Sequence, residues 1–560
     1  MKYIKLSLIF AIAFFISCAE PAHTQGNTDA AGNQNNITTV SFDGSTARIT
    51  GTGAIFSNGV LTINQAGTYV LSGRLDNGRI LTNIARTDTV RLVLNNLSLN
   101  SNTGPAIYSA RSREIIIILE SGSQNNISDG RVSRNDDHNA AIFVQHSLSI
   151  QGSGTLNVNG NYHHGIRAQD YLTINSGTIN VTAQGDALRG RDGVIINNGI
   201  FNLNAGGDGI QSNNANSDDV GYVTITGGTF NIRAANDGIQ AESILTISGG
   251  SFNIITGGGS ANAPPRAVSF GGGRGGRGFP APQAPQNPAA ESDSMKGLKA
   301  RTLVFITGGT FNIDSADDGI HSDNDIHIAG GSIQIRTGDD GIHADNNVLI
   351  SGGDINIIES YEGIEGMTVT ITGGNIRVFA SDDGINAAGG RTRNDMFIRI
   401  TGGIVDVHVL ATGDTDGLDS NGNIFLEGGT LRVSGGSQIM AGAIDLDGQF
   451  VVTGGELITA GAIQSVSSNS TQPVLMVSYN TLQPIGSVIS VRDRNGNILL
   501  EYTSRTAFSV SGFSSPNFRT GQTYTLFVNG IRQTDIQLNG MITRISNTGG
   551  TYNPGGRGFR

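Results

Sequence analysis

The chain has 560 residues, of which 81 are glycine, 14% are charged, one is cysteine and none is tryptophan. Glycine at this level without a Gly-X-Y period is typical of β structure with many turns and excludes collagen; the length is sufficient for a large core. The single cysteine excludes an internal disulfide framework, and the formal net charge of −11 argues against nucleic acid as a ligand.

The first 18 residues predict an export signal. Two lysines precede an apolar run from Leu6 to Ile16, and a serine and Cys18 end the segment. A small residue followed by cysteine is the usual end of a bacterial lipoprotein signal, so we expect lipid attachment at Cys18. The alternative is an ordinary signal peptide that happens to contain a cysteine. No other stretch of the sequence is apolar for long enough to span a bilayer.

Residues 19–37 are polar and predict a flexible tether. Because Ala19 and not an aspartate follows Cys18, we expect the lipid anchor to lie in the outer membrane or at the cell surface. The sequence therefore predicts an exported protein of the cell envelope that contacts the membrane through its anchor alone.

Residues 38–470 predict a β-solenoid. The clearest repeat consists of DDGIHSD, DDGIHAD, YEGIEG and DDGINA, whose glycines Gly319, Gly341, Gly363 and Gly384 are separated by 22, 22 and 21 residues. A Gly-Gly pair recurs at the same step and supplies the positive φ that a corner needs. Such a period fits a leucine-rich repeat or a parallel β-helix. Since no leucine-rich consensus recurs, we predict an all-β, right-handed parallel β-helix with coils of about 22 residues.

The aliphatic residue after each turn should point into the solenoid, because neighbouring side chains along a strand alternate between its two faces. We expect Ile320, Ile342, Ile364 and Ile385 to stack in one interior row. The full series of inward positions is Ile142, Ile166, Leu188, Ile210, Ile239, Leu298, Ile320, Ile342, Ile364, Ile385, Leu418 and Ile444.

Two segments depart from this repeat. The widest step, between Ile239 and Leu298, contains a Gly/Pro/Arg-rich insertion at 258–294, which we expect to be disordered because it has too few aliphatic residues for a core. After the repeat ends, strand and turn signals continue without the D-G-I pattern. They predict a small C-terminal β cap at 471–545, followed by a flexible tail at 546–560.

The acidic residues before the turn glycines should form a row along the solenoid. Asp318, Asp340, Glu362 and Asp383 align one coil apart, and carboxylates about 5 Å apart repel by about 3 kcal/mol per pair at an effective dielectric constant near 20. A cation among them would relieve this repulsion, and hard oxygen ligands in irregular turns suit Ca²⁺. The alternative is turn chemistry, because the side chain of an aspartate before glycine commonly bonds the backbone two residues on.

The residue after each inward aliphatic should point outward and form a second row. This row is Arg167, Arg189, Gln211, Gln240, Lys299, His321, His343, Glu365, Asn386 and Asp419. Such a polar ribbon suits a polysaccharide, whereas the alternative is a merely solvated face. Candidate ligand-binding residues are Lys299, His321, Asp323, His343, Asp345, Arg167 and Arg189. We expect the two histidines to be polar surface residues rather than metal ligands.

Several motifs in this order carry a family resemblance: GTYVLSG (Gly67–Gly73), KGLKA (Lys296–Ala300), the D-G-I blocks and FSSPNFRTGQTYTL (Phe513–Leu526). The chain resembles a bacterial family of secreted carbohydrate-binding proteins with a calcium-containing, pectate-lyase-like right-handed β-helix. The resemblance implies binding of cellulose-like or acidic sugars with Ca²⁺ and no established catalysis. It supports as the cation cluster Asp317, Asp318, Asp339, Asp340, Glu362, Glu365, Asp382 and Asp383.

The functional hypothesis is a monomeric, surface-anchored lipoprotein that binds acidic or cellulose-like polysaccharide without cleaving it. One alternative is a calcium-dependent polysaccharide lyase, for which Lys299 is the candidate base that removes a proton from the sugar. A base has to be free of ion pairs, and we expect Lys299 to lie near Asp323, Asp318 and Glu242. The other alternative is a structural adhesin.

Overall fold

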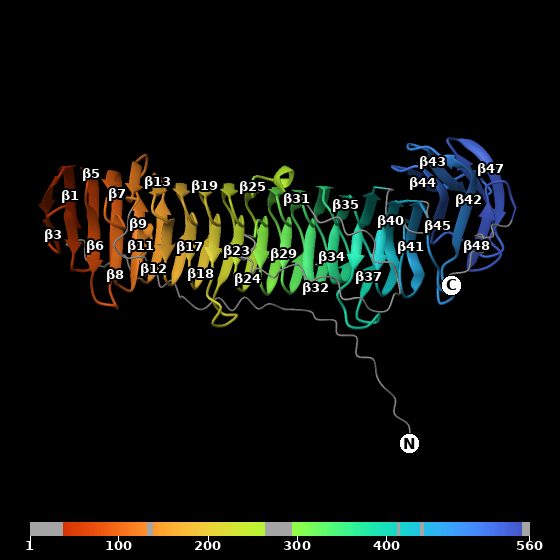
Figure 1. Ribbon diagram of the computed structural model, residues 1–560, viewed down its shortest axis with the longest axis horizontal. Helices are drawn as coiled ribbons and strands as arrows, with labels where there is room; N and C mark the ends of the chain where they lie inside the picture. Colours follow the sequence, from red (N-terminus) through yellow and green to blue (C-terminus); the bar gives the residue numbers. More distant parts are fainter. Residues whose placement is uncertain (1–36, 132–137, 264–293, 411–414, 437–441, 551–560) are drawn as a thin grey trace, which may run out of the picture.

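The computed structural model describes residues 37–131, 138–263, 294–410, 415–436 and 442–550. The chain is all-β, a parallel solenoid of about 14 turns with a small β cap at its C-terminal end (Figure 1). The expected fold class is therefore confirmed. The predicted signal segment, lipidation at Cys18, and the tether except Ile37 lie outside the described residues.

Each coil contributes up to three strands, and the strands of successive coils pair in parallel to form three faces. The first is named the charged face. It consists of β4 (Val60–Ile63), β6 (Arg79–Asn83), β8 (Ile107–Arg111), β11 (Ala140–Val144), β14 (His164–Ala168), β17 (Leu188–Gly190), β20 (Ile210–Ser212), β23 (Ile239–Ala241), β26 (Leu298–Ala300), β29 (Ile320–Ser322), the first parts of β32 (Ile342–Ile350) and β34 (Ile364–Ile371), β36 (Ile385–Ala387) and β39 (Leu418–Ser420).

The second face follows the first in each coil and is named the middle face. It consists of β9 (Glu114–Leu119), β12 (Ser147–Gly152), β15 (Tyr171–Ile174), β18 (Gly193–Ile196), β21 (Tyr222–Ile225), β24 (Ile244–Ile247), β27 (Leu303–Ile306), β30 (Asp325–Ile328), the second parts of β32 and β34, β37 (Phe397–Ile400) and the first parts of β40 (Asn423–Ser434) and β41 (Phe450–Ala460).

The third face is named the amide face, after its outward asparagines. It consists of β10 (Gln124–Ser128), β13 (Thr155–Gly160), β16 (Thr178–Ala183), β19 (Ile200–Ala205), β22 (Thr229–Ala234), β25 (Ser251–Thr256), β28 (Thr310–Ser315), β31 (Ser332–Thr337), β33 (Asp354–Glu359), β35 (Asn375–Ala380), β38 (Ile404–Val409) and the second parts of β40 and β41.

The predicted interior row is present. Ile320 pairs in register with Ile342, Ile342 with Ile364, and Ile364 with Ile385, and all four side chains are fully buried. The other expected inward aliphatics are buried as well. Behind the amide face, the rings of Phe201, Phe230, Phe252 and Phe311 stack with centroids 4.6 Å apart. One continuous apolar core therefore runs along the axis.

The glycine pairs form corners, as expected. The second glycine of four successive pairs has a φ between 95° and 106°, a region that favours glycine. These residues are Gly309, Gly331, Gly353 and Gly374. A Cβ at Gly331 would also lie 3.1 Å from the carbonyl oxygen of Gly309 in the preceding coil. Close stacking of coils therefore requires glycine at this corner.

The insertion does not disturb the register of the solenoid. Ile239 pairs with Leu298 across it, as any two adjacent coils pair. The expectation that all of 258–294 lacks regular structure is wrong at its start, where Ser260–Asn262 forms a 3-10 turn (η2). The N–H of Ser260 donates to Asp314 Oδ1 at 2.7 Å, which fixes this turn against the amide face. Residues 264–293 lie outside the described chain.

Antiparallel strands close both ends. At the start, β1 (Ile37–Gly44) pairs with β2 (Thr46–Thr50), β3 (Ala54–Ser57) pairs with β4, and β5 (Gly67–Leu75) and β7 (Thr89–Asn100) lead into the coils. At the other end, β45 (Phe508–Ser514) pairs antiparallel with β41 and with β42 (Val474–Gln483). The remaining cap strands are β43 (Val488–Arg492), β44 (Ile498–Thr503), β46 (Thr523–Val528), β47 (Ile531–Gln537) and β48 (Ile542–Ser546).

In the part of the chain that the structure describes, no helix is long and apolar enough to cross a membrane.

Candidate functional site

The residues before the turn glycines form one row along the edge of the charged face, here named the turn row. Each following residue donates its N–H to the carbonyl oxygen of the next member of the row, so the coils are in register. In order, the row is His164, Asp186, Asp208, Asp237, Lys296, Asp318, Asp340, Glu362, Asp383 and Asp416.

One carboxylate oxygen of each turn-row aspartate binds the backbone of the next coil. Asp318 Oδ1 accepts the N–H of Asp340 at 3.1 Å, and Asp340 Oδ1 accepts the N–H of Glu362 at 3.3 Å. Asp186, Asp208 and Asp237 act in the same way. These bonds link successive coils, whereas the turn-chemistry alternative predicted a bond to the backbone two residues on within one turn.

The second carboxylate oxygen of several turn-row residues meets the outward side chain three positions later. Asp186 Oδ2 lies 3.0 Å from Arg189 Nη1, Asp318 Oδ2 lies 2.8 Å from His321 Nδ1, and Asp340 Oδ2 lies 3.3 Å from His343 Nδ1. Each aspartate therefore holds its outward neighbour in place.

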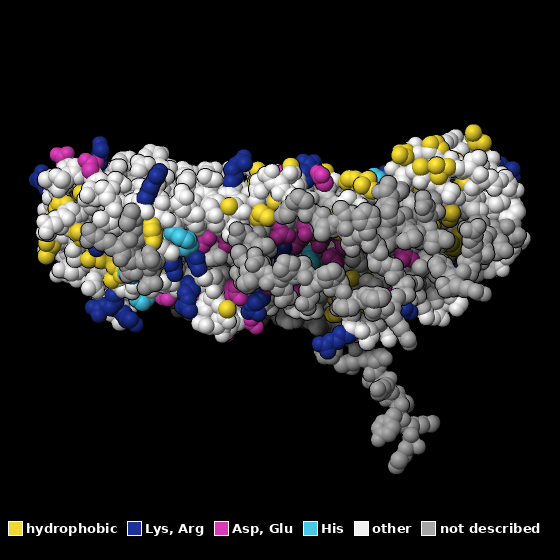
Figure 2. All heavy atoms as spheres, viewed as in Figure 1, with side chains coloured by type: hydrophobic (Ala, Val, Ile, Leu, Met, Phe, Trp, Pro, Cys, Tyr) yellow, Lys and Arg dark blue, Asp and Glu magenta, His cyan; other side chains and the backbone are white. Residues whose placement is uncertain are grey.

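The outward side chains themselves form the expected second row, here named the outer column. Arg167, Arg189, Gln211, Gln240, Lys299, His321, His343, Glu365, Asn386 and Asp419 pair in register from one coil to the next. Figure 2 shows acidic, basic and histidine side chains gathered along the middle of the solenoid. The ordered sequence of basic, amide, histidine and acidic side chains is confirmed.

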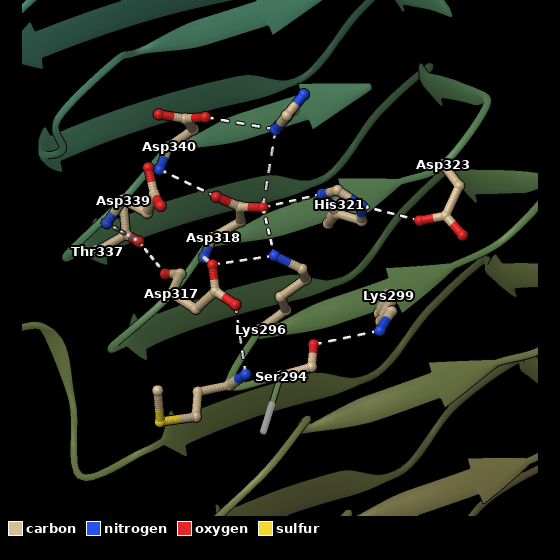
Figure 3. Close-up of polar contacts among 12 residues, drawn as sticks. Ser294, Lys296, Lys299, Asp317, Asp318, His321, Asp323, Thr337, Asp339 and Asp340 are labelled. Carbon is tan, nitrogen blue, oxygen red and sulfur yellow. Dashed lines mark hydrogen bonds and ion pairs between the residues drawn. The ribbon is translucent and has the colours of Figure 1, made fainter. Parts of the chain in front are cut away.

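Lys296 is the site residue that sequence reasoning missed. Its Nζ lies 2.9 Å from Asp317 Oδ1 and 2.7 Å from Asp318 Oδ2 (Figure 3). Burial would lower the pKa of Lys296, but Asp318 and Asp317 outweigh burial and raise it. The signal was present, because KGLKA places Lys296 one 22-residue step before Asp318. A lysine therefore already compensates the first pair of the expected cation cluster.

Lys299 has different neighbours from those expected. Its Nζ lies 3.7 Å from Asp237 Oδ2 and 3.2 Å from Ser294 Oγ. Glu242, one of the expected neighbours, instead pairs with Arg301 at 3.2 Å. Lys299 thus has an acidic partner, but it is Asp237, from the same preceding coil as the expected Glu242.

The two histidines are more enclosed than polar surface residues. His321 is only 9% exposed, and its Nε2 lies 3.0 Å from Asp323 Oδ1. Burial would lower the pKa of His321, but its hydrogen bonds to Asp318 and Asp323 raise it overall. For His343, Asp340 and the charge of Asp318 outweigh burial and raise the pKa to about 9.

Carboxylates predominate in the C-terminal part of the two rows, where His343 faces Glu365. Burial, followed by repulsion from nearby carboxylates, raises the pKa of Glu362 to about 9 and that of Glu365 to about 7. Burial and acidic neighbours likewise raise the pKa of Asp383 to about 8 and that of Asp419 to about 7. The amide of Asn386 donates to Glu362 Oε2 at 3.0 Å, and its Oδ1 has no partner among the described residues.

Three sets of side chains place one ligand atom each within 4.8 Å of one another and could hold a metal ion. The sets are Asp318, His321 and His343; Asp340, His343 and Glu365; and Asp317, Asp318 and Asp339. From the expected cation cluster, Glu362, Asp382 and Asp383 do not join such a set within the described chain. The two histidines, which the sequence assigned to the surface, take part in two of the three sets.

Arg167 and Arg189 are held by neighbouring side chains. Arg167 donates to Asn139 and lies over the ring of Phe143, with 5.4 Å between its Cζ and the ring centroid. Arg189 contacts Asp186 and lies 3.2 Å from His164 Nε2. Burial, reinforced by Arg189, lowers the pKa of His164 to about 4 although Asp186 opposes this effect. The basic end of the outer column is therefore a fixed arrangement.

The amide face contains a second polar row. Its asparagines donate to one another along the axis: Asn180 to Asn157 at 2.8 Å, Asn202 to Asn180 at 2.7 Å, and Asn312 to Asn253 at 2.8 Å. A shallow groove of about 540 Å³ follows these strands. The sequence signal was the recurrence of asparagine at the same strand position, as in TINV, TFNI and SFNI.

A family model described as carbohydrate-binding domain-containing protein matches residues 57–341 and 339–476. A carbohydrate-binding domain-containing protein of Acetivibrio thermocellus is 30% identical over 126 residues, which are 22% of this chain and 44% of that protein. This chain thus spans less than half of that relative. A solved polysaccharide lyase-like protein from C. thermocellum, in a gadolinium derivative, is 29% identical with a TM-score of 0.37, over 39% of this chain and 91% of that one. With most of its length matched by the family model, the chain belongs to the carbohydrate-binding domain-containing protein family.

Proposed function

We propose that the protein binds polysaccharide along the charged face and does not cleave it. The observation that carries this proposal is the outer column, in which ten polar side chains lie in register on a rigid sheet. Sugar hydroxyls and carboxylates require convergent hydrogen-bond donors and acceptors, which this column supplies. Membership of the carbohydrate-binding family supports the same class of ligand.

The order of side chains favours an acidic polysaccharide. The half of the column from Arg167 to Lys299 supplies guanidinium, amide and ammonium donors, which bind sugar carboxylates and hydroxyls. The half from Glu365 to Asp419 supplies acceptors, which repel a sugar carboxylate unless a cation lies between them. A cellulose-like chain, which has only hydroxyls, is the second ligand that this proposal includes.

Calcium fits the C-terminal part of the turn row and outer column better than the part around Asp318. Asp317 and Asp318 are already compensated by Lys296, and the nitrogen ligands of the histidines do not suit Ca²⁺. Glu362, Glu365 and Asp383 offer oxygen alone, and their raised pKa values mean that a proton or a cation stabilises them. We therefore propose Ca²⁺ at these residues, a smaller set than the sequence predicted, and expect the ion to draw together carboxylates that do not form a set within 4.8 Å of one another in this structure.

The absence of cleavage is part of the proposal and rests on Lys299. Its ammonium group contacts Asp237 and Ser294. A proton-abstracting base has to be free and aimed at the sugar, which this pairing prevents. Anchoring through Cys18 at the cell envelope and a monomeric state also remain proposals, supported by the sequence alone.

Binding of polygalacturonate and of cello-oligosaccharides to the purified chain, measured by calorimetry, tests the proposal. Gln240→Glu keeps an oxygen that can accept the hydrogen bond from Gln211 but adds a negative charge to the basic half of the outer column. We expect it to weaken polygalacturonate binding about tenfold. The matched control is Gln334→Glu on the amide face, which should leave binding unchanged. Equal effects of the two substitutions would place the ligand elsewhere.

The same preparation tests cleavage. Incubation with polygalacturonate and Ca²⁺ should give no absorbance from unsaturated products. An increase that disappears in Lys299→Ala would overturn the non-catalytic assignment in favour of the lyase.

A further inference from the structure

The imidazoles of His321 and His343 have no role in the calcium proposal. Calcium is bound by oxygen ligands, whereas neutral imidazole suits zinc, copper, nickel and iron. The two histidines lie in adjacent coils. Strand β29 pairs with β32, and this pairing places His321 in register with His343. Their rings are close, with centroids 5.1 Å apart and planes at 84°.

Both imidazoles turn Nδ1 toward Asp318 Oδ2, although His343 Nδ1 lies closer to Asp340 Oδ2, at 3.3 Å. Asp318 Oδ2 lies 2.8 Å from His321 Nδ1 and 3.8 Å from His343 Nδ1. Ligand atoms of a tetrahedral ion with bonds of about 2.0–2.2 Å are separated by about 3.4 Å. The two oxygen–nitrogen distances lie on either side of this value and the three ligand atoms lie within 4.8 Å of one another, so side-chain shifts of less than 1 Å would bring these two distances to that of ligands of one ion.

The other nitrogen of each imidazole faces a second carboxylate. His321 Nε2 lies 3.0 Å from Asp323 Oδ1, and His343 Nε2 lies 3.8 Å from Asp345 Oδ1 and 3.9 Å from Glu365 Oε2. Metal-binding histidines usually donate their second N–H to such a group, which fixes the tautomer and the ring orientation. Asp323, Asp345 and Glu365 are placed for this role.

The surroundings hold the site rigid. Asp318 is 2% exposed, its other oxygen is fixed by the N–H of Asp340, and His321 is 9% exposed. Lys296 Nζ shares Asp318 Oδ2 at 2.7 Å and thus competes with any ion for this ligand. The set formed by Asp340, His343 and Glu365 has only one imidazole, so the pair of imidazoles at Asp318 is the better site for a transition metal.

We propose that Asp318, His321 and His343 bind one divalent transition-metal ion of the zinc class, with Lys296 limiting its affinity. Three protein ligands leave the fourth position of a tetrahedral ion to water. The ligands of this site differ from those of the calcium proposed at Glu362, Glu365 and Asp383, where Glu365 would serve both sites, and metal binding here does not depend on glycan binding.

The test is calorimetric titration of the full chain, free of any histidine tag and treated with a chelator, with ZnCl₂ and separately with CaCl₂. We expect one zinc ion per chain that excess Ca²⁺ does not displace. The same chain titrated with Co²⁺ should show the intense visible absorption of a tetrahedral complex with imidazole ligands. His343→Gln should weaken zinc binding at least 100-fold while the thermal unfolding profile stays cooperative.

Two further variants separate the site from general effects. His327→Gln, on the middle face and outside all three sets, is the matched control and should bind zinc as the unsubstituted chain does. Lys296→Met should tighten zinc binding about tenfold, because the competing ammonium is removed from Asp318. Glu362→Gln should leave zinc binding unchanged, which distinguishes this proposal from the calcium site. Absence of zinc binding, or equal binding in His343→Gln, would overturn the proposal.

Discussion

The charged face and the amide face are built on strands of the same coils. Their outward rows differ in which groups serve as hydrogen-bond partners of the side chains. An asparagine carries both a donor and an acceptor, so copies of it stack and bond one another, as Asn202 and Asn180 do at 2.7 Å. An ionised carboxylate only accepts, so copies of it cannot do the same. The carboxylates of the turn row instead accept hydrogen bonds from backbone N–H groups and from Arg189, Lys296 and His321.

This difference shows what repetition allows in a solenoid. A neutral amide row can be extended coil by coil without a change of residue. A charged row has to vary along its length, because each carboxylate requires a donor or a cation of its own. Variation among otherwise equivalent coils, from Arg189 through His321 to Glu365, therefore indicates where ligands are expected.

The largest difference between the two faces is expected when a turn-row carboxylate with several partners is removed. Asp186→Ala deletes the acceptor of the Asp208 N–H and the partner of both Arg189 and His164. We expect a loss of about 3 kcal/mol in the free energy of unfolding, because buried donors remain unpaired. Denaturant titration followed by circular dichroism measures the shift. A loss below that of a typical surface substitution would show that the carboxylate is not needed.

The pH dependence of stability should distinguish the two faces at Asp208, which is a titratable residue of the turn row. Burial, with Asp237 and Asp186 nearby, raises the pKa of this carboxyl from 3.8 to about 8. The folded chain thus binds a proton that the unfolded chain releases, so this contribution to stability is complete below about pH 4 and is lost as the pH rises to about 8. Asp208→Asn mimics the protonated group and should flatten this slope in unfolding experiments between pH 4 and 8.

The amide of Gln211 donates to Asp208 Oδ2, which lowers the pKa of Asp208 but does not outweigh burial and the two neighbouring aspartates. The control is Asn204→Ala on the amide face, which removes no titratable group. If Asp208→Asn and the unsubstituted chain share one pH profile, then Asp208 is ionised in the folded chain.

Glu362→Gln makes one position of the charged face resemble the amide face. The substitution removes a carboxylate whose pKa is raised to about 9 by burial, Glu365 and Asp340, so the chain without calcium should become more stable by about 1 kcal/mol. The increase in melting temperature on adding Ca²⁺ should shrink to about half. Asp395→Asn, an exposed acidic control outside the two rows, should leave the calcium response unchanged. An unchanged response in Glu362→Gln would contradict the calcium assignment.

The smallest effect is expected from the reverse change on the amide face. Asn202→Asp keeps the oxygen that accepts from Asn231 but replaces the group that donates to Asn180. Because this side chain is exposed, water relieves most of the repulsion, and we expect a loss of about 0.5–1 kcal/mol at pH 7 that vanishes near pH 3. A loss as large as that of Asp186→Ala would mean that the amide row stabilises the solenoid as strongly as the turn row.

The sequence predicted the parts of this molecule that depend only on the period. A step of 22 residues places Ile320 above Ile342 and His321 above His343, and alternation decides which of them faces inward. The sequence could not predict side-chain directions across coils. Lys299 follows Gln240 in the outer column as expected, but the repeat does not specify the rotamers that bring Lys299 to Asp237 and His343 to Asp318.

The uninterrupted pairing of Ile239 with Leu298 has a consequence for how such rods are assembled and modified. Each coil packs only against the coils before and after it. The length of the connection between two coils therefore does not change how their strands pair. Closing a longer connection costs only about 0.6 kcal/mol for each doubling of its length. At the corner beside η2, an inserted segment can therefore be replaced by another while the register of every other coil stays the same.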